Sequence, residues 1–307
     1  MRHITEEEVR AALPMPRAIE LVEEAFRRLD DGRAVNLPRR RLSLENRAML
    51  HDLPAGDSVS NLVGAKLYVT SRGGTRFVYV LFDSASAELL AVIDADSLGQ
   101  IRTGAATGLA TRLLSAPGAA TAAVIGSGYQ AETQLEAIAA VRRLERVRVF
   151  SRREENRKAF ADRMSRRLGV AVDAVDSAEE AVRGALIVAT ITSSRDPVLL
   201  GDWLEPGCHV NAAGSNHVKR RELDGVAIER AGLIAADSVE QAKLEAGDLV
   251  QAAEEGRLEW NRVQEFSAVV SGKVRRSSPD EVTLFESQGI GLEDLAVAEH
   301  VWRTIGG

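Results

Sequence analysis

Hydrophobic and polar positions follow one spacing before residue 119 of this 307-residue chain and another spacing after it. In the first part, residues 16–31 carry apolar side chains at helical intervals, while the runs 64–70, 77–82 and 89–93 are rich in strand-forming residues. A helix of small residues is predicted at 103–114, and the Pro and Gly that follow end it. The pattern therefore predicts a mixed α+β region at the start of the chain.

After residue 119, short apolar runs alternate with segments of helical spacing. Such alternation is typical of βαβ units, whose strands form a parallel sheet. The segment 282–302, which follows Pro279, is predicted to be a helix that could fold back onto either region. The predicted strands are 121–125, 147–150, 170–175, 186–190, 209–212 and 233–236, and the predicted helices between them begin at 130, 154 and 177.

The turn after the first strand of this alternating part carries the clearest chemical information. Residues 126–131 read Gly-Ser-Gly-Tyr-Gln-Ala, directly behind the apolar run 121–125 and at the start of a helix, which is the context of a dinucleotide fingerprint. Gly126 permits the tight turn, Gly128 lets a pyrophosphate approach the backbone, and Ala131 lets helix and strand pack closely. The helix N-terminus offers free N–H groups to phosphates. We favour a Rossmann-type doubly wound α/β domain over an ordinary strand–turn–helix.

The end of the second strand indicates which dinucleotide is preferred. A site for NAD(H) usually has an acidic residue there, which binds the ribose 2′-hydroxyl. This chain has Ser151, Arg152 and Arg153 instead, and these side chains would bind and neutralise a 2′-phosphate. We therefore expect a preference for NADP(H), with NAD(H) possible. The alternative is that the two arginines are a solvated helix start, where cations oppose the helix dipole.

Composition narrows the class of protein further. The chain has a net charge of −6 and 45% hydrophobic residues, so it can bury a large core and has no overall basic field for nucleic acid. It has no apolar stretch of membrane-spanning length, and its first residues do not resemble a signal peptide. Its one cysteine, Cys208, is expected to be a small buried residue in a reducing compartment, and we expect a cytoplasmic protein. The histidines have no spacing that predicts a metal site.

Six segments together resemble the ornithine cyclodeaminase/mu-crystallin family. They occur in the family's order and cover nearly the whole chain. Each is loose by itself, but the ordered set is specific. The segments are Gly64–Lys66, Asp96–Ala106, Ile125–Ala131, Asn211–Asn216, Arg221–Asp224 and Leu284–Asp294.

The resemblance implies a homodimer of two-domain chains. Residues 1–118, with 285–307 folding back, would form the substrate and dimerisation domain, and 119–284 the dinucleotide domain. It also implies that a hydride passes between a nicotinamide and the α-carbon of a small amino, imino or oxo acid. The residues expected to contact the cofactor are Arg102, Thr103, Gly126, Ser127, Gly128, Tyr129, Gln130, Ser151, Arg152, Arg153, Thr190, Ile191, Thr192, Gly214 and Ser287.

By the same resemblance, Lys66 and Arg102 face the substrate, and Arg39 or Arg41 joins them at its carboxylate. A buried carboxylate needs paired cations, and arginine can bind it through two hydrogen bonds. Lys66 could also donate a proton, because burial near other cations depresses the pKa of an amine. Without the resemblance, a lysine at position 66 of a predicted strand would be either on the solvent-exposed face of the sheet or functional. We expect Arg102 to lie at a helix start, where a cation suggests an anionic partner.

Two positions depart from the cyclodeaminase branch of the family. Asn216 stands where that branch has an aspartate, and His51 where it has another acid. Asn216 cannot act as a general base. His51 could donate a proton to an imine, because the unperturbed pKa of histidine is about 6.5, and the alternative is that it is a histidine of the turn before Pro54. The missing acids favour imine or ketimine reduction, or an amino-acid dehydrogenase, over ornithine deamination with cyclisation, although Asp52 could compensate. His217 is a secondary candidate. A non-catalytic NADPH- or small-ligand-binding protein is the third possibility.

Overall fold

The structure, a computed structural model, describes residues 1–306, which divide into two compact units. Unit 1 comprises Met1–Ala105 and Gly289–Gly307, and unit 2 comprises Ala106–Gln288. The division falls inside helix α3 (Asp96–Leu114), whose two halves contribute to different units. The sequence-based boundaries were placed after this helix, at 118/119, and at 284/285.

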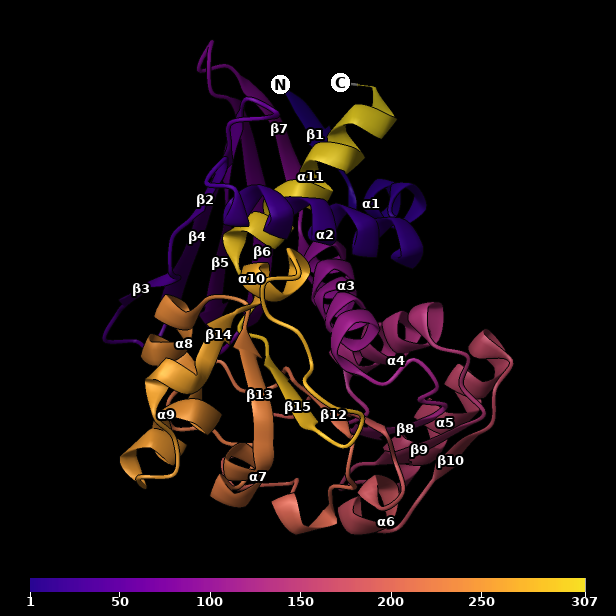
Figure 1. Ribbon diagram of the computed structural model, residues 1–307. Coiled ribbons are helices and arrows are strands. Elements are labelled where there is room, and N and C mark those ends of the chain that lie inside the picture. Colours follow the sequence, from indigo (N-terminus) through magenta and orange to yellow (C-terminus); the bar gives the residue numbers. More distant parts are fainter. Residues whose placement is uncertain (307) are drawn as a thin grey trace. The chain divides into compact units, whose positions relative to one another are not determined.

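Unit 1 is built on a seven-stranded sheet. Its strands run in the order β1-β7-β6-β5-β4-β2, with β3 paired to β4, and every pair except β1–β7 is antiparallel. Helix α11 (Gly291–Ile305) packs along β4, β5 and β6, and also against α2 (Met15–Asp30) and α1 (Glu6–Ala12) (Figure 1). The strands are β1 (Arg2–Ile4), β2 (Ala34–Asn36), β3 (Arg40–Ser43), β4 (Met49–Asp57), β5 (Leu62–Ser71), β6 (Gly74–Asp83) and β7 (Leu89–Asp94).

Alternation along these strands separates the two faces of the sheet. On β5, Gly64 and Lys66 are buried, whereas Val63 before them and Val69 after them are 43% and 42% exposed. The buried positions face α11, since side chains of successive strand residues point to opposite sides. The other face is apolar and open to solvent. It includes Leu50, Val63, Leu67, Val69, Val78, Val80 and Phe82 of β4, β5 and β6, and we call it the open sheet face.

Unit 2 is built on an eight-stranded parallel sheet in the order β10-β9-β8-β11-β12-β15-β13-β14. The first strand, β8, lies in the middle, β9 and β10 follow on one side of it, and β11 and β12 on the other. The crevice between β8 and β11 is the topological switch point, where α/β sheets bind ligands. The strands are β8 (Thr121–Ile125), β9 (Arg146–Phe150), β10 (Val172–Ala174), β11 (Ile187–Thr190), β12 (His209–Ala212), β13 (Ala231–Ala236), β14 (Val263–Glu265) and β15 (Val282–Glu286).

Helices cover both faces of this sheet, so the core of unit 2 has two layers. Ala122 and Val124 of β8 pack with α4 and α5, whereas Ala123 and Ile125 belong to the cluster on the other face. Figure 1 shows α4 and α5 beside β8, β9 and β10, and α7, α8 and α9 near β13. The helices are α4 (Tyr129–Val141), α5 (Glu154–Leu168), α6 (Ala178–Val182), α7 (Gly225–Arg230), α8 (Val239–Glu245), α9 (Gly247–Glu254) and α10 (Phe266–Val270).

The predicted fold class, a doubly wound parallel sheet with a mixed α+β region, is confirmed. Two element predictions were wrong. The segment 282–302 is not one helix, because its first residues form β15, between β12 and β13 in the sheet interior. Arg102 is not at a helix start, because α3 begins at Asp96 and Arg102 lies in its second turn. The strand β4 was not predicted at all.

Candidate functional site

The turn between β8 and α4 has the shape that the dinucleotide fingerprint requires. Gly126 has φ of 124°, and a Cβ there would overlap with the carbonyl of Ile191, so only glycine fits this position. At Gly128, nothing lies within 4 Å of where a Cβ would be, which leaves room for a ligand next to the backbone. Ala131 is fully buried against the sheet. The geometry thus fits a pyrophosphate at the N-terminus of α4.

A cleft of about 570 Å³ opens at this turn. It joins the ends of β8, β9 and β11, which is where the switch point of the sheet predicts a ligand site. Several predicted cofactor residues line it, together with six residues that the sequence did not assign to the cofactor, Ile125, Phe150, Asn156, Ser193, Ser194 and Val198. The lining residues are Ile125, Gly126, Ser127, Gly128, Phe150, Ser151, Arg152, Arg153, Asn156, Ile191, Thr192, Ser193, Ser194 and Val198.

The three residues expected at a 2′-phosphate lie together at one end of this lining. Ser151 directly follows β9, and its hydroxyl lies 2.7 Å from that of Ser127 in the glycine turn. Arg152 and Arg153 are exposed, and Arg153 is the N-cap residue of α5. These positions leave both guanidinium groups able to reach a ligand in the cleft. They would offer a 2′-phosphate two cations and two hydroxyl groups.

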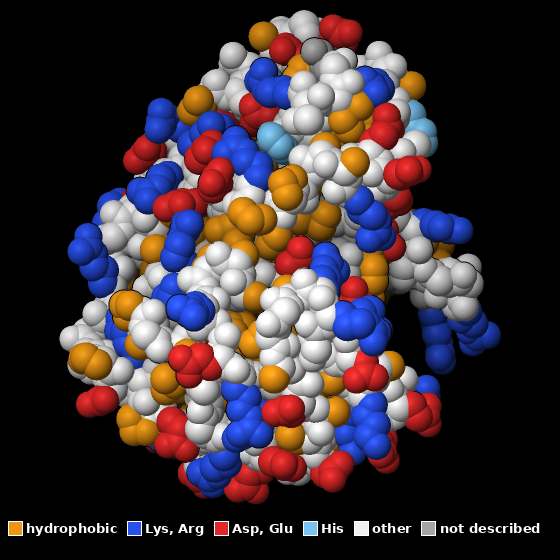
Figure 2. Space-filling model, turned by 90° about the vertical axis from the view of Figure 1, so that its right-hand side faces the viewer, with side chains coloured by type: hydrophobic (Ala, Val, Ile, Leu, Met, Phe, Trp, Pro, Cys, Tyr) orange, Lys and Arg blue, Asp and Glu red, His pale blue; other side chains and the backbone are white. Residues whose placement is uncertain are grey.

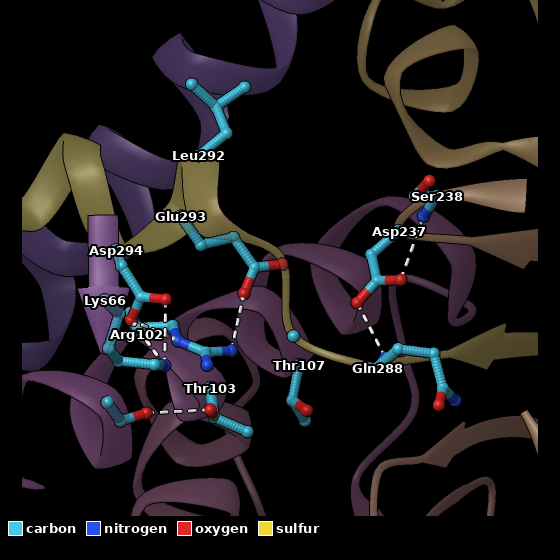
Figure 3. A network of polar contacts seen from close by, with 12 residues as sticks. Lys66, Arg102, Thr103, Thr107, Asp237, Ser238, Gln288, Leu292, Glu293 and Asp294 are labelled. Carbon is cyan, nitrogen blue, oxygen red and sulfur yellow. Dashed lines mark hydrogen bonds and ion pairs between the residues drawn. The ribbon is translucent and has the colours of Figure 1, made fainter. Parts of the chain in front are cut away.

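The remaining cofactor candidates are divided between the two units. In unit 2, Thr190 is buried at the end of β11, Gly214 lies just beyond β12, and Ser287 is buried just beyond β15. Tyr129 and Gln130 form the first turn of α4, with Tyr129 44% exposed. In unit 1, Thr103 lies on α3 next to Arg102, and its hydroxyl donates a hydrogen bond to the carbonyl of Gly99 (Figure 3).

Within unit 1, the two predicted substrate-binding cations meet at the first turn of α11. The Nζ atom of Lys66 lies 2.9 and 2.8 Å from the two carboxylate oxygens of Asp294. The guanidinium of Arg102 donates from Nε to Asp294 and from Nη1 to Glu293, each at 2.9 Å (Figure 3). All four side chains are at most 5% exposed. Asp294 therefore holds Lys66 and Arg102 against each other.

Gly289 makes this arrangement possible. Its φ is 72°, and a Cβ there would overlap with the guanidinium of Arg102. Its carbonyl accepts a hydrogen bond of 3.0 Å from Nη2 of Arg39, which is 8% exposed. The structure thus brings Arg39 to the same backbone turn as Arg102. Gly289, in the segment between β15 and α11, thus contacts both arginines.

The electrostatics of the cluster set the protonation of Lys66. Burial, followed by the neighbouring charge of Arg102, lowers the pKa of Lys66 to about 8, while Asp294 opposes this shift. The amine is therefore mainly protonated at neutral pH, yet much more acidic than an exposed lysine. A proton donor is most efficient when its pKa is close to the working pH.

His51 and Arg41 form a separate group on the same sheet. They face each other across β3 and β4, and the imidazole of His51 stacks on Tyr68 with ring centroids 4.0 Å apart. Burial, and then the charges of Arg41 and Arg39, lower the pKa of His51 to about 4. The imidazole is therefore neutral near pH 7, which makes it a poor proton donor. Asp52, next in the strand, points to the opposite face of the sheet and cannot replace the acid that His51 replaces.

The other predicted residues lie in unit 2. Asn216 is half-buried and His217 is exposed, both in the loop after β12. Cys208, directly before β12, is fully buried, and burial raises the pKa of its thiol to about 12. Within residues 1–306, no group of three or more His, Cys, Asp or Glu side chains is arranged to hold a metal ion. No helix in that range is long and apolar enough to cross a membrane.

The site contains carboxylates that the sequence reasoning did not assign. Glu293 and Asp294 were noticed only as part of a family-like segment, and acids in the first turn of a helix are normally explained by the helix dipole. Their partners are 191 and 192 residues away in sequence, so no local pattern could have paired them.

The doubly wound sheet, the glycine turn and the cleft beside it define unit 2 as a dinucleotide-binding type of domain. Residues 2–306 match the model of the ornithine cyclodeaminase/mu-crystallin family. The chain belongs to this family, as its ordered segments predicted.

Known relatives are similar to this chain over most of its length. A Delta(1)-pyrroline-2-carboxylate reductase of Bacillus cereus is 37% identical over 228 residues, 74% of this chain and 70% of the relative. Among solved structures, the Thermococcus litoralis Delta(1)-pyrroline-2-carboxylate reductase in complex with NADH and L-proline matches with a TM-score of 0.94 and 30% identity, over 99% of this chain and 97% of that one. An archaeal alanine dehydrogenase dimer with bound NAD matches with a TM-score of 0.91 and 32% identity, over 98% and 94%.

Proposed function

We propose that this protein is an NADPH-dependent reductase of small imino acids, which also works in reverse as an amino-acid dehydrogenase. The observation that carries the proposal is the buried Lys66–Arg102 pair, held by Asp294 and Glu293 within unit 1. Two relatives are named as reductases of a cyclic imino acid and one as an amino-acid dehydrogenase, which supports the same chemistry here.

The side chains of unit 1 have distinct tasks in this proposal. A reduced nicotinamide, when bound, supplies the hydride that reduces the imine carbon. Arg102 and Arg39 bind the substrate carboxylate, since a buried carboxylate needs cations and hydrogen-bond donors. Lys66 donates the proton that the imine nitrogen requires, because its ammonium is buried and has a pKa near 8. Neutral His51 would line the site without carrying the proton.

The preference for NADP(H) remains our proposal, since the two solved relatives described above were obtained with NADH and NAD. It is supported by the cleft lining at Ser151, Arg152 and Arg153 in place of an acidic residue. An exposed arginine can bind a 2′-phosphate through two hydrogen bonds. A carboxylate at this place would repel that phosphate.

The roles of the two units and the oligomeric state are also proposed. The first 118 residues and 285–307 would form the substrate and dimerisation domain, and 119–284 would bind the dinucleotide. The open sheet face of unit 1 supports a homodimer, because large exposed apolar patches mark interfaces between proteins. A second copy of the chain is its occupant in this proposal, as the alanine dehydrogenase relative is a dimer.

We expect the partners of this protein to be small molecules and not nucleic acids. On the face drawn in Figure 2, Lys and Arg side chains are interspersed with Asp and Glu, so no continuous basic surface attracts nucleic acid there. The single free cysteine supports a reducing compartment, and we propose the cytoplasm.

Cyclodeamination is the less favoured activity. It would need an acid near the substrate to hold a second amino group. Asn216 is not acidic, and Asp52 lies on the other side of the sheet from Lys66. The carboxylates of Glu293 and Asp294 are already engaged by Arg102 and Lys66.

The proposal is tested by mixing the purified protein with NADPH or NADH and a panel of cyclic imino acids, or of 2-oxo acids with ammonia. Loss of the reduced-nicotinamide absorbance shows turnover. Ornithine with the oxidised cofactor is run in parallel and assayed for ammonia. Oxidation with imino acids and no ammonia from ornithine supports the reductase. Ammonia and proline from ornithine would replace it with a cyclodeaminase, and binding of NADPH without turnover of any substrate would indicate a ligand-binding protein.

A further inference from the structure

One buried carboxylate in unit 2 joins two loops that lie near the cleft. Glu222 is fully buried, and its Oε1 atom accepts a hydrogen bond of 2.5 Å from the backbone N–H of Thr192. Its Oε2 atom accepts from the hydroxyl of Thr190 at 2.9 Å and from the backbone N–H of Gly214 at 2.8 Å. Three donors from the ends of β11 and β12 therefore meet on a single carboxylate.

A second buried carboxylate, that of Asp248, fixes the backbone at Glu222. The Oδ1 atom of Asp248, also fully buried, accepts from the backbone N–H groups of Glu222 and Leu223, both at 2.7 Å. At Gly214, a Cβ would overlap with both the backbone of Thr192 and the carboxylate of Glu222. The two loops thus approach each other as closely as glycine allows, and the carboxylate occupies the remaining space.

The position of these loops at the ends of β11 and β12 predicts which part of a bound dinucleotide they would contact. In a doubly wound sheet the pyrophosphate lies on the glycine turn, and the adenosine ribose lies at the end of the next strand. Those are Gly126–Gly128 and Ser151–Arg153 in this chain. Ile191 and Thr192 line the same cleft on the β11 side of the switch point, so the nicotinamide half is left for that side.

We propose that Glu222 is a positioning residue for the nicotinamide half of the cofactor, because it fixes the backbone of Thr192 and Gly214 relative to each other. This inference rests on the proposed function, since it presumes a nicotinamide dinucleotide in the cleft. Glu222 touches neither substrate nor cofactor in this proposal. It acts through the loops that it holds.

A carboxylate is needed at this place because all three partners are donors. The isosteric amide of glutamine would turn an N–H₂ group toward either the N–H of Thr192 or that of Gly214, and one buried donor would lose its acceptor. Losing a hydrogen bond to a charged group costs about 1.5–3 kcal/mol, which corresponds to about 10- to 100-fold in an equilibrium constant. Burial and the neighbouring Asp248 raise the pKa of Glu222 to about 7, while Thr192 and Thr190 oppose this shift. The comparison with glutamine is therefore made at about pH 8.5, where Glu222 is mainly ionised.

The test is a comparison of two ligands in the whole protein. Glu222→Gln is titrated with NADPH and with 2′-phospho-ADP-ribose, which lacks the nicotinamide, and both dissociation constants are measured by calorimetry. We expect about 10- to 100-fold weaker binding of NADPH and an unchanged affinity for 2′-phospho-ADP-ribose. Equal weakening of both ligands, or of neither, would overturn the inference. The selective loss is a readout that a merely structural role would not produce.

Two further variants complete the test. Glu286→Gln is the matched control, since burial already holds the pKa of Glu286 well above its usual value and a neutral amide resembles the protonated acid. Its affinities for both ligands should equal those of the wild type. If Glu222→Gln does not fold, Thr190→Val removes one donor and leaves the two backbone bonds, and it should weaken NADPH alone by about 2- to 10-fold. No selective loss in Thr190→Val would then overturn the inference.

Failure of the proposed function is recognised separately. If the wild-type protein binds neither NADPH nor NADH, the nicotinamide cofactor itself is contradicted. If it binds NADH but not NADPH, only the NADP(H) preference is lost, and the same comparison of Glu222→Gln with the wild type is made with NADH and ADP-ribose. If the wild type binds both ligands and Glu222→Gln behaves like it, only the role of Glu222 is lost.

Discussion

Asp294→Asn is the substitution that most directly tests how the cluster in unit 1 controls a proton. Asp294 contacts Lys66 with both carboxylate oxygens and Arg102 with one. Its negative charge opposes the two effects that lower the pKa of Lys66, which are burial and the charge of Arg102. The asparagine variant keeps the shape of the side chain but removes this charge. The pKa of Lys66 must then fall below about 8.

The size of the fall follows from the geometry. Unit charges about 4 Å apart interact by about 4 kcal/mol at an effective dielectric constant of about 20, which is an upper limit of about 3 pKa units. Partial compensation by nearby groups leaves an expected shift of about 1–3 units. A shift of two units lowers the protonated fraction of Lys66 at about pH 7.5 roughly twentyfold, and kcat/KM for imine reduction falls with it.

The assay is the pH profile of kcat/KM for NADPH-dependent imine reduction. In the wild type, the protonated amine is the active form, so kcat/KM should be level at lower pH and decline as pH rises through about 8. In Asp294→Asn, the decline should begin at a lower pH. Glu293→Gln is the matched control, because Glu293 binds Arg102 and the loss of its charge should raise KM while moving the decline less. An unmoved decline in Asp294→Asn, or equal movement in both variants, would refute the role of Lys66 as the donor.

Four further results are expected. Arg152→Ala should weaken NADPH binding about tenfold or more and NADH binding little, and equal losses in a fluorescence titration would refute the 2′-phosphate assignment. Asn216→Asp should raise ammonia release from ornithine relative to imine reduction, and an unchanged product ratio would discard a role for this position. Val63→Arg with Val69→Glu should convert a dimer to monomers in sedimentation, whereas an unchanged mass would place the interface elsewhere. Because the pKa of Glu222 is raised to about 7, the folded state binds more protons than the unfolded one between pH 4.5 and 7, so its contribution to the free energy of unfolding should decline as pH rises through that range. This contribution is the difference between the free energies of unfolding of the wild type and Glu222→Gln, measured by urea titration at each pH. A difference that rises with pH would contradict the raised pKa of Glu222.

The parts of the fold that were predicted from sequence have short-range patterns. The strand 121–125 and the helix 154–168 were found with their observed bounds, since the first is a continuous apolar run before a glycine turn and the second has helical spacing. The strand β4 was missed because His51, Asp52, Pro54 and Gly56 interrupt its apolar positions. Its alternation becomes visible only when the buried face of the sheet is known.

The misassigned end of the chain has a similar physical cause. Residues 282–286 read Val-Thr-Leu-Phe-Glu, a mixed segment too short to distinguish a strand from a helix, and all five are buried. Their strand conformation is decided by pairing with β12 and β13, which lie far away in sequence. The role of the Glu293 and Asp294 carboxylates could not be predicted for the same reason. They bind Arg102, which lies far away in the sequence and reaches them only in the folded chain.

The most direct test of the central claim follows the hydride itself. The protein is given NADPH carrying deuterium at nicotinamide C4, on either face in separate samples, together with the imino acid that it reduces fastest. Mass spectrometry of the amino-acid product should show one deuterium at the α-carbon from one labelled face and none from the other. Product without deuterium from either face would contradict hydride transfer to an imine, and with it the function proposed for this chain.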